Sequence, residues 1–222
     1  MQLCQLAGDW RGKLPAGGAM AERKWDGIRA MRYRGIDGIN RLFSRNGMPI
    51  EGTGHIAYFL DHVERVAGEP WFFDGEFVVD GTLAATKAWF EKGWKAGGEA
   101  GTLYLFDGFP YRDWRAGGCD MPLYARKARL KALVDQVQGD EALSWEYRPG
   151  SRGDDRWATA VQMLADEWVF DAADAINAAR RVWAVEGEGV MLKAAEAPYK
   201  RNRNDAWLKV KMENFSKWRM AA

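Results

Sequence analysis

Runs of β-branched, aromatic and alternating apolar residues mark the stretches that we expect to form strands. Residues 28–33 and 39–44 form such a pair, and the Gly-Ile-Asp-Gly sequence between them predicts a hairpin connection. The strongly apolar run 71–79 predicts a further strand, which ends at an Asp-Gly turn signal at 80–81. The remaining strand-like runs are 103–106, 189–193 and 206–212.

Apolar positions spaced three and four residues apart mark the expected helices. From Ile56 to Val66 this spacing is regular and predicts a helix of about three turns. Residues 84–100 mix Ala, Lys and Gly and predict a helix followed by a loop. The other expected helices cover 123–137, 157–164 and 172–183. Because strands and helices mix without regular βαβ alternation, the pattern predicts an α+β fold with largely antiparallel sheets flanked by helices.

The chain is expected to fold mainly as one domain. Its 222 residues are enough to bury roughly 70% of the surface that the unfolded chain would expose. Residues 1–19 are rich in Gly and show little periodicity, so we expect a loosely ordered lead-in. The domain is then expected to cover 20–215, with a short tail at 216–222.

Cysteine and histidine usage narrows the possible chemistry. Cys4 and Cys119 lie far apart without metal-like spacing, which fits a reducing cytoplasm better than a disulfide framework. No run of about 18 apolar residues and no signal-peptide pattern is present, so we expect no membrane partner and a cytoplasmic location. His55 and His62 are the only histidines, which argues against a His-based triad or a His-rich metal site. The chemistry must then use Lys, Arg, Asp and Glu.

Positive charge is concentrated near the C-terminal end of the sequence. The net charge of the whole chain is only +1, but residues 193–219 contain eight basic and three acidic residues. A local basic stretch of this kind is typical of phosphate contacts. A solvated surface is the alternative, and charge alone does not decide between the two.

The run Lys-x-Asp-Gly-x-Arg at 24–29 is the candidate reaction centre. A lysine amine in its neutral form can attack the α-phosphorus of a nucleoside triphosphate and form a phosphoramidate. Asp26 would orient the Lys24 amine or hold a metal-bound water, and Gly27 would allow the backbone to approach the nucleotide closely. The structural alternative is a simple turn at Asp26-Gly27 between surface charges.

Five further motifs follow this run in order, and the set resembles the covalent nucleotidyltransferase superfamily of DNA ligases, RNA ligases and mRNA capping enzymes. They are Ser-Arg-Asn-Gly at 44–47, Asp-Gly-Glu at 74–76, Leu-Phe-Asp at 105–107, Glu-Gly-Val-Met-Leu-Lys at 188–193 and Trp-Leu-Lys-Val-Lys at 207–211. A Tyr-Lys pair at 199–200 resembles DNA ligases in particular. The resemblance implies the ATP-grasp-like adenylation domain of a small ATP-dependent DNA ligase of the bacteriophage or bacterial type.

The resemblance also implies the residues around the nucleotide. Lys24 is the nucleophile and Asp26 its neighbour, while Lys209 and Lys211 contact the α-phosphate and complete the catalytic set. The other expected nucleotide contacts are Glu22 at the adenine amino group, Glu76 at the ribose, Phe106 on the purine face, Lys193 at a phosphate, and Arg29 and Arg45. An adenine amino group is a hydrogen-bond donor, so the carboxylate of Glu22 favours ATP over GTP.

Metal and DNA contacts complete the expected site. Glu188 and Glu76 are the expected ligands of Mg²⁺, because hard carboxylates suit this ion. Arg29 and Arg45 are also expected at DNA phosphates, and the basic stretch adds three further candidates, Lys200, Arg201 and Arg203.

The implied activity is sealing of nicks in double-stranded DNA by a monomer. Lys24 would take AMP from ATP, pass it to the 5′-phosphate at a nick, and the 3′-hydroxyl would then displace AMP. An RNA ligase or a GTP-using capping enzyme remains an alternative, as does a catalytically silent nucleic-acid-binding module. Labelling with ATP or GTP, and nicked DNA compared with nicked RNA, separate these possibilities.

The end of the sequence adds one expectation. The chain ends eleven residues after Lys211, so we expect no OB-fold domain of the kind that usually follows in the family, and the chain is either an adenylation domain excised from a longer ligase or an unusually reduced natural ligase. Lysine adenylation is then expected to be slow and nick binding weak and salt-dependent. We expect three segments to replace part of the missing clamp, namely the Gly-rich N-terminal segment, the 85–101 loop and the basic 193–219 stretch.

Overall fold

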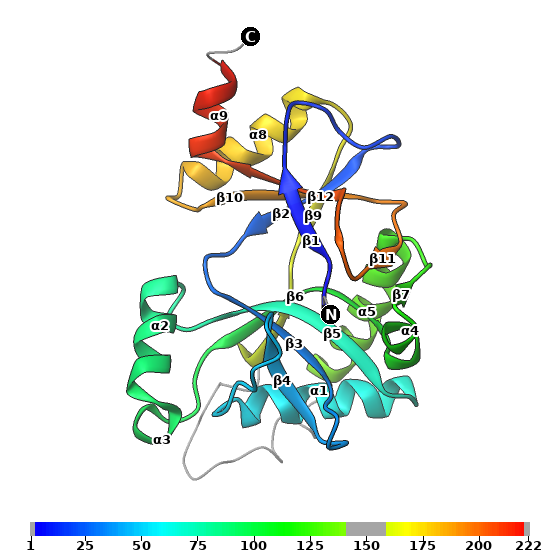
Figure 1. Ribbon diagram of the computed structural model, residues 1–222, viewed down its shortest axis with the longest axis vertical. Coiled ribbons are helices and arrows are strands. Elements are labelled where there is room, and N and C mark those ends of the chain that lie inside the picture. The colour runs from blue at the N-terminus through cyan, green and yellow to red at the C-terminus, as the bar shows by residue number, and fades with distance from the viewer. Residues whose placement is uncertain (1–2, 141–158, 220–222) are drawn as a thin grey trace. The chain divides into compact units, whose positions relative to one another are not determined.

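The computed structural model describes residues 3–140 and 159–219, which form two compact units, and Figure 1 labels their helices and strands. Unit 1 combines Met1–Asp26, Gly117–Ala125 and Leu164–Ala222, and unit 2 combines Gly27–Ala116 and Arg126–Met163. The chain therefore passes from unit 1 to unit 2 inside the Lys-x-Asp-Gly-x-Arg run. Each unit is built on its own five-stranded sheet.

The sheet of unit 1 has the strand order β1-β12-β10-β2-β9, and only its β1–β12 pair is parallel. Its strands are β1 Leu6–Asp9, β2 Ala19–Lys24, β9 Asp166–Val169, β10 Gly189–Ala194 and β12 Arg203–Lys211. One face of this sheet packs against α8 Ala172–Trp183. Small side chains at Ala175, Ala178 and Ala179 allow this helix to lie close to the strands.

Shorter elements complete unit 1. Strand β7 Gly118–Cys119 pairs with β11 Tyr199–Lys200, and helix α9 Met212–Arg219 follows β12. Helix α8 begins after Asp171, whose carboxylate accepts a hydrogen bond from the backbone N–H of Asp174 at 2.8 Å. A cap of this kind typically contributes about 1 kcal/mol.

The sheet of unit 2 has the order β4-β3-β5-β6-β8, and only its β6–β8 pair is parallel. Its strands are β3 Ile28–Arg34, β4 Asn40–Ser44, β5 Trp71–Val78, β6 Thr102–Pro110 and β8 Val161–Met163. The helices are α1 Gly54–Ala67, α2 Leu83–Lys92, α3 Trp94–Gly97, α4 Tyr111–Arg115 and the part of α5 Leu123–Gln138 from Arg126 onward.

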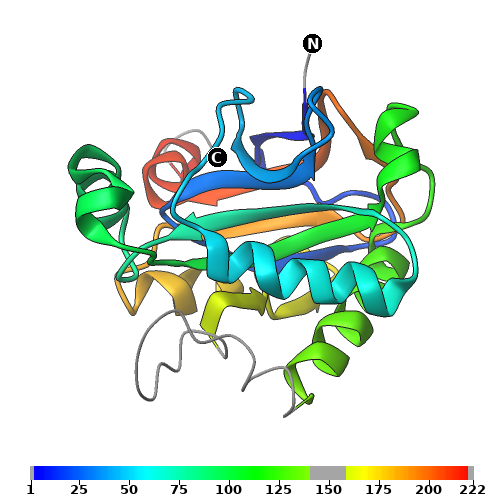
Figure 2. The same ribbon diagram turned by 90° about the horizontal axis from the view of Figure 1, so that it is seen from below.

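Helix α1 carries much of the core of unit 2, and Figure 2 shows it running across one face of the sheet. Its four inward apolar residues are 0% exposed, namely Ile56, Phe59, Leu60 and Val63. Burying one side chain of this kind typically contributes about 1.5–3 kcal/mol. The helix faces apolar residues of β5 and β6, including Phe73, Phe77 and Leu105. This face of the sheet therefore forms the hydrophobic core of unit 2.

Most of the elements predicted from apolar spacing are confirmed, and the α+β class with largely antiparallel sheets is correct. The hairpin of β3 and β4, helix α1, strand β5 and helix α8 start and end within two residues of their predicted limits. Helix α2 is also present, although the predicted loop after it contains the short helix α3.

Two predictions about local structure are wrong. Residues 161–163, expected in a helix over 157–164, form β8, while 157 and 158 lie outside the described residues. Val161 is 0% exposed and pairs with Leu103 of β6, so a long-range partner overrides the local pattern. Likewise, the expected loose lead-in over 1–19 contains β1, which pairs with β12 about two hundred residues away in the sequence.

The expected domain limits stay a prediction. The division of the chain into two compact units does not test whether residues 20–215 fold as one independent domain. Part of the expected tail at 216–222 belongs to α9, which extends to Arg219. Among residues 3–140 and 159–219, no helix has the length and apolar character needed to cross a membrane. Cys4 and Cys119 are both buried as thiols.

Candidate active site

The face of the unit 1 sheet opposite α8 gathers most of the expected catalytic residues. Side chains alternate along a strand, so Ala21, Val190 and Leu208 enter the core while their neighbours face the other way. The strand register aligns these neighbours in three rows across β2, β10 and β12: Lys24, Gly189, Lys211; then Glu22, Met191, Lys209; then Met20, Lys193, Trp207. We call these nine residues the lysine face.

Glu188 joins the two lysines at one end of the lysine face. Its carboxylate accepts a hydrogen bond from Nζ of Lys24 and forms an ion pair with Nζ of Lys211 through its other oxygen. The three side chains are 20–27% exposed, so they are open to a ligand. Burial alone would raise the pKa of Glu188, but hydrogen bonds from Lys211 and Lys24 hold it below its ordinary value.

The charge of Lys211 is stabilised by its surroundings. Its hydrogen bond to Glu188 is the main cause of a raised pKa, opposed by burial and assisted by the charges of Glu188, Glu213 and Asp26. Asp26 is therefore an exposed carboxylate close enough to act electrostatically on the lysine face. Lys209 forms an ion pair with Asp9 of β1 at 3.1 Å, a partner that sequence reasoning missed.

The glycine after Glu188 is required by backbone packing. Gly189 has a φ of +145°, and a Cβ there would lie 2.0 Å from the carbonyl oxygen of Val210. Only a residue without a side chain lets β10 and β12 approach this closely. Gly189 of the motif at 188–193 is therefore explained by this close approach of the two strands, and Glu188 lies directly before β10.

A buried ion pair occupies the other end of the lysine face. Nζ of Lys193 lies 2.6 Å from the carboxylate of Glu22, and both side chains are 1% exposed. The same Nζ lies 4.3 Å from the centre of the Trp207 ring. Glu22 and Lys193, expected to contact adenine and phosphate respectively, are thus in contact with each other.

In unit 2, Arg29 is fixed by Asp74, a residue of the Asp-Gly-Glu motif to which the sequence analysis assigned no role. Its Nε and Nη2 donate to the two oxygens of Asp74 at 2.8 and 2.5 Å, and Asp74 is 0% exposed. The guanidinium also lies 5.1 Å from the centre of the Phe106 ring. A charged residue inside the aromatic run at 71–77 was the available signal for Asp74.

A β-bulge explains how Phe106 reaches the face that carries Arg29. In the β5–β6 register Asp74 pairs with Asp107 and Gly75 with Leu105, so Phe106 is the extra residue. Leu105 enters the core under α1, whereas Phe106 contacts Arg29 on the opposite face. Bulges often redirect a side chain in this way beside functional sites. Glu76 is half-buried on β5, directly opposite Arg29 of β3.

The carboxylates of Asp74 and Asp107 lie on directly opposed residues of β5 and β6, which would be unfavourable without counter-charges. Arg126 supplies the second counter-charge, with Nε and Nη2 at 2.9 and 2.8 Å from the two Asp107 oxygens. Both side chains of this pair are 0% exposed. Two bidentate arginine pairs therefore stabilise the strands that carry Glu76 and Phe106.

Gly27 and Arg45 are the remaining expected residues of unit 2. A Cβ at Gly27 would lie 2.5 Å from the Phe77 carbonyl oxygen, so contact with β5 already requires a glycine there. The role of Gly27 at the nucleotide stays a prediction. Arg45 is exposed in the turn that follows β4.

The basic residues Lys200, Arg201 and Arg203 lie in and beside the turn between β11 and β12. Gln5, which is 0% exposed, fixes this turn by accepting from the Lys200 N–H at 2.9 Å and donating to Asn204 at 3.3 Å. The Gln5 N–H also donates to the Tyr199 hydroxyl at 3.1 Å. The N-terminal segment is therefore a structural support of the basic turn.

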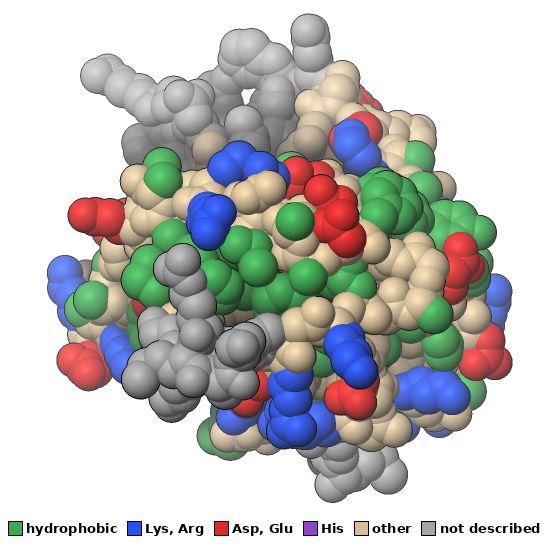
Figure 3. Space-filling model, turned by 90° about the horizontal axis from the view of Figure 1, so that it is seen from above, with side chains coloured by type: hydrophobic (Ala, Val, Ile, Leu, Met, Phe, Trp, Pro, Cys, Tyr) green, Lys and Arg blue, Asp and Glu red, His purple; other side chains and the backbone are tan. Residues whose placement is uncertain are grey.

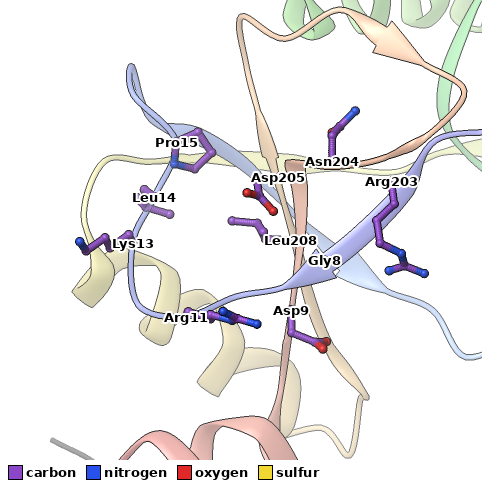
Figure 4. Close-up of a pocket in the computed structure, with 10 residues that line it drawn as sticks. All are labelled: Gly8, Asp9, Arg11, Lys13, Leu14, Pro15, Arg203, Asn204, Asp205 and Leu208. Atoms are coloured by element: carbon purple, nitrogen blue, oxygen red, sulfur yellow. The ribbon is translucent and has the colours of Figure 1, made fainter.

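A pocket of about 840 Å³ adjoins this turn in unit 1 (Figure 4). It is lined by Gly8, Asp9, Arg11, Lys13, Leu14, Pro15, Arg203, Asn204, Asp205 and Leu208. Leu208 projects from β12 on the side opposite Lys209, whereas Asp9, which also lines the pocket, forms the ion pair with Lys209. The face of the molecule shown in Figure 3 carries basic and acidic side chains interspersed with one another. Hydrophobic side chains gather near the centre of this face.

The chain matches a family of known proteins over almost its whole length. Residues 3–211 match the model of the ATP dependent DNA ligase domain. A probable DNA ligase of Kineococcus radiotolerans is 29% identical over 200 residues, which cover 88% of this chain and 34% of that protein. This chain thus spans about a third of the length of that relative.

Solved structures share the fold. The structure named Pmar-Lig_PreS3 has a TM-score of 0.72 and 24% identity, and the match covers 94% of this chain and 46% of that one. The ATP-dependent DNA ligase from bacteriophage T7 in complex with ATP has a TM-score of 0.68 and 18% identity, with 96% and 69% covered. The nucleotidyltransferase fold expected from the motifs is confirmed by these matches.

Proposed function

Because this chain belongs to the family of ATP-dependent DNA ligase domains, we propose that Nζ of Lys24 attacks the α-phosphorus of ATP. A nitrogen–phosphorus bond forms, the bond to the β-phosphate oxygen breaks, pyrophosphate leaves, and the amine loses a proton to solvent. The observation that supports this proposal most strongly is the contact of both Lys24 and Lys211 with Glu188 on one face of a sheet. The T7 ligase structure with ATP supports ATP as the nucleotide.

Before ATP binds, Lys24 forms an ion pair with Glu188, and this pair is the starting state of the proposed reaction. In this ion pair Lys24 is an ammonium group, which has no lone pair, so it must lose a proton before it can attack. Lys211 and Lys209 remain beside the reacting phosphorus, where fixed cations neutralise charge that develops on the phosphate oxygens. Positioning and charge neutralisation supply most of the catalysis in phosphoryl transfer.

Mg²⁺ is the metal that we propose for the reaction. Mg²⁺ is usually held by one or two carboxylates together with substrate phosphates and water, so a dedicated cluster of protein ligands is not needed. Glu188 fits this requirement as a partly exposed carboxylate among phosphate-binding lysines. When bound there, the ion would neutralise phosphate charge. Glu76 stays a proposed second ligand, carried by β5.

In unit 2 we propose that Phe106 stacks on the purine and that Glu76 binds the ribose. Arg29 would contact the ribose or the 5′-phosphate of DNA, and Arg45 would contact the nucleotide or the nicked strand. The rigid Arg29–Asp74 pair supports a positioning role, because a guanidinium held at two points presents its remaining N–H groups in fixed directions.

We further propose that the lysyl-AMP is used to seal nicks in double-stranded DNA. AMP would pass from Lys24 to the 5′-phosphate, and the 3′-hydroxyl would attack that phosphate and release AMP. Lys200, Arg201 and Arg203 are the proposed contacts to the DNA backbone, with Arg11 and Lys13 of the nearby pocket wall as additions. We also propose that the protein is monomeric and cytoplasmic, which suits its two buried thiols.

Labelling tests the first step. The chain is incubated with Mg²⁺ and ATP labelled at the α-phosphate, then denatured and separated on a gel. We expect label on the wild type and on Lys87→Ala, an exposed lysine of α2, and none on Lys24→Ala. Equal labelling of Lys24→Ala would contradict the proposal.

Nick binding tests the DNA contacts. Charge reversal at Lys200, Arg201 and Arg203 should weaken binding to a nicked duplex and flatten its dependence on salt, by about 0.9 in the logarithmic slope for each lost phosphate contact. Reversal at Lys87 and Lys92, both exposed on α2, provides the matched control. Unchanged binding in the first variant would exclude this surface, and a nicked RNA duplex in parallel measures strand preference.

A further inference from the structure

The chain between α8 and β10 forms a tight turn that leads directly to Glu188. The Gly187 N–H donates to the carbonyl oxygen of Val182 at 2.9 Å, and the Glu186 N–H donates to the carbonyl oxygen of Trp183 at 3.0 Å. These are the two hydrogen bonds of a Schellman motif, which ends a helix and fixes the direction in which the chain leaves it. The path of the chain from α8 to Glu188 is therefore defined by backbone hydrogen bonds.

Two residues show how tightly this turn is constrained. Glu186 has a φ of +57°, a left-handed conformation that is strained for a residue with a side chain. A Cβ at Gly187 would lie 2.4 Å from Cγ1 of Val182 and 3.0 Å from its carbonyl oxygen, so contact with α8 requires a glycine there. A strained residue persists only where its surroundings hold it, so we looked for a contact that holds this turn from outside.

The side chain of Trp183 supplies such a contact. Its indole Nε1–H donates to the carbonyl oxygen of Glu188 at 3.3 Å, across the turn. The ladders that join β10 to β2 and β12 begin at Gly189, so Glu188 lies one residue outside them. The indole therefore fixes the backbone of Glu188 at a point that these ladders do not reach.

The same indole also contacts the helix that follows Lys211. Helix α9 begins at Met212, directly after Lys211, and lies beside α8 (Figure 1). The ring of Phe215 on α9 packs against Trp183, with ring centres 5.6 Å apart. Trp183 thus lies between the backbone of Glu188 and the helix that continues from Lys211, and it contacts the segments that carry both members of this ion pair.

We infer that Trp183 is a positioning residue for the reaction of Lys24 with ATP, which holds Glu188 where one carboxylate contacts both Lys24 and Lys211. This inference rests on the proposed function and extends its machinery to a side chain outside the six motifs. Trp183 belongs to α8, which packs on the face of the sheet opposite the lysine face, so it acts through Glu188. Misplacing a reacting group by about 1 Å can slow a step about 10²-fold, so support from behind the sheet affects the rate.

Trp183→Phe tests the inference, because it removes the indole N–H and keeps a ring against Phe215. The full chain is incubated with Mg²⁺ and ATP labelled at the α-phosphate, and the rate of lysyl-AMP formation is measured over a range of ATP concentrations. The rate at saturating ATP should fall about 10- to 100-fold. The ATP concentration that gives half the maximal rate should stay within about twofold of the wild-type value, because Trp183 acts through Glu188 and not on the nucleotide.

Trp89→Phe is the matched control. The indole N–H of Trp89 also donates to a backbone carbonyl, that of Gly98 in unit 2, at 3.1 Å. Each variant therefore loses one indole–carbonyl hydrogen bond, and urea unfolding followed by circular dichroism should show midpoints lowered by similar amounts. Only Trp183→Phe should slow labelling in the absence of urea. An equal loss of rate in the two variants would overturn the inference, because it would assign the loss to stability alone.

Substitutions of Glu186 test the same turn with Trp183 intact, and they serve where Trp183→Phe does not fold. Glu186 is exposed, so a change there removes little packing. Glu186→Gly adopts the positive φ without strain and should raise the urea midpoint and leave the rate unchanged. Glu186→Val places a β-branched side chain at this φ and should slow labelling as Trp183→Phe does. A folded Glu186→Val chain with the wild-type rate would contradict the inference, because the turn would then have no influence on Glu188.

The outcomes separate this inference from the proposed function. A wild-type chain that ATP does not label would overturn the proposed function and this inference with it. If the wild type is labelled and Trp183→Phe is labelled at the same rate, the inference alone fails. It also fails if Trp183→Phe reaches the wild-type rate at higher ATP concentration, because that result would assign Trp183 a role in nucleotide binding.

Discussion

Two groups of charged side chains, one in each unit, differ in exposure and in geometry. In unit 1, Lys24 and Lys211 share the single carboxylate of Glu188, and all three side chains are 20–27% exposed. In unit 2, Arg126 holds both oxygens of Asp107, and the two side chains are 0% exposed. A lysine ammonium is a compact charge on a flexible stem, whereas a guanidinium is a planar fork that matches a carboxylate at two points.

This difference indicates which pairs can be exchanged for a ligand. A partly exposed lysine pair contributes little to folding, because solvent screens it, and its partners are free to turn to a phosphate or a metal. A buried bidentate pair cannot open without leaving a charge in the interior. We therefore expect substitutions in the Arg126–Asp107 pair to affect folding first, and substitutions of Lys24, Lys211 or Glu188 to affect the reaction first.

The largest expected effect is on folding, from Arg126→Met. Removing one partner of a buried ion pair leaves Asp107 uncompensated, which typically costs about 3–5 kcal/mol. Urea unfolding followed by tryptophan fluorescence measures the change in midpoint. Arg129→Met, three residues later on α5 and 42% exposed, is the control and should shift the midpoint far less. Equal shifts of the urea midpoint in Arg126→Met and Arg129→Met would contradict the claim that the buried pair contributes more to folding than the exposed one.

Lys211→Met should have nearly as large an effect, but on the reaction. Loss of one fixed charge at the reacting phosphate typically slows a step by about 10²–10³-fold. The rate of lysyl-AMP formation measures this, and the urea midpoint of the same variant should stay close to that of the wild type. If Lys211→Met instead unfolds at a lower urea concentration and forms lysyl-AMP at the wild-type rate, Lys211 acts in folding and not in the reaction.

Phe106→Ala should have a smaller effect on nucleotide binding. Stacking of a base on an aromatic ring is typically worth about 1–3 kcal/mol. The ATP concentration needed for half-maximal labelling should therefore rise by roughly 5- to 150-fold. Phe90→Ala, a partly exposed ring on α2, is the matched control. An unchanged concentration dependence for Phe106→Ala would exclude its role as a base platform.

The smallest expected effect is the pH dependence of the Glu188 pair. The pKa of Glu188 is lowered in the folded state, so its contribution to stability is present above the ordinary glutamate pKa of about 4.3. That contribution is lost as the pH falls through the lowered value. The raised pKa of Lys211 sets the alkaline limit, because its contribution is lost as the pH rises through that value.

Comparison of the wild type with Glu188→Gln measures this dependence. The wild type should be more stable by less than about 1 kcal/mol between these limits, because the pair is partly exposed. The difference should vanish below the lowered pKa of Glu188. A difference that grows as the pH falls would have the wrong sign for a carboxylate stabilised by two lysines.

The sequence predicted elements and motif residues well where the signal is local. The helical spacing from Ile56 to Val66 and the apolar run at 71–79 each reflect one face packing on one core, so their elements were found. The pairing of β1 with β12, and of β8 with β6, depends on partners far along the chain. Local periodicity does not contain that information, which is why both strands were missed.

Site residues follow the same rule. The motifs identified Lys24, Glu188 and Lys211 as a set, and the register of β2, β10 and β12 explains why they meet. The contact between Glu22 and Lys193 was not predicted, because it depends on a diagonal between neighbouring strands. The bulge that turns Phe106 toward Arg29 is a single extra residue in a ladder, which an apolar strand pattern does not reveal.

Mass spectrometry of the chain after incubation with ATP and Mg²⁺ tests the central claim most directly. We predict one added AMP, located by fragmentation on the peptide that contains Lys24, and its complete absence in Lys24→Ala. AMP on another residue, or an unmodified wild-type chain at saturating ATP, would contradict the assignment of Lys24 as the nucleophile.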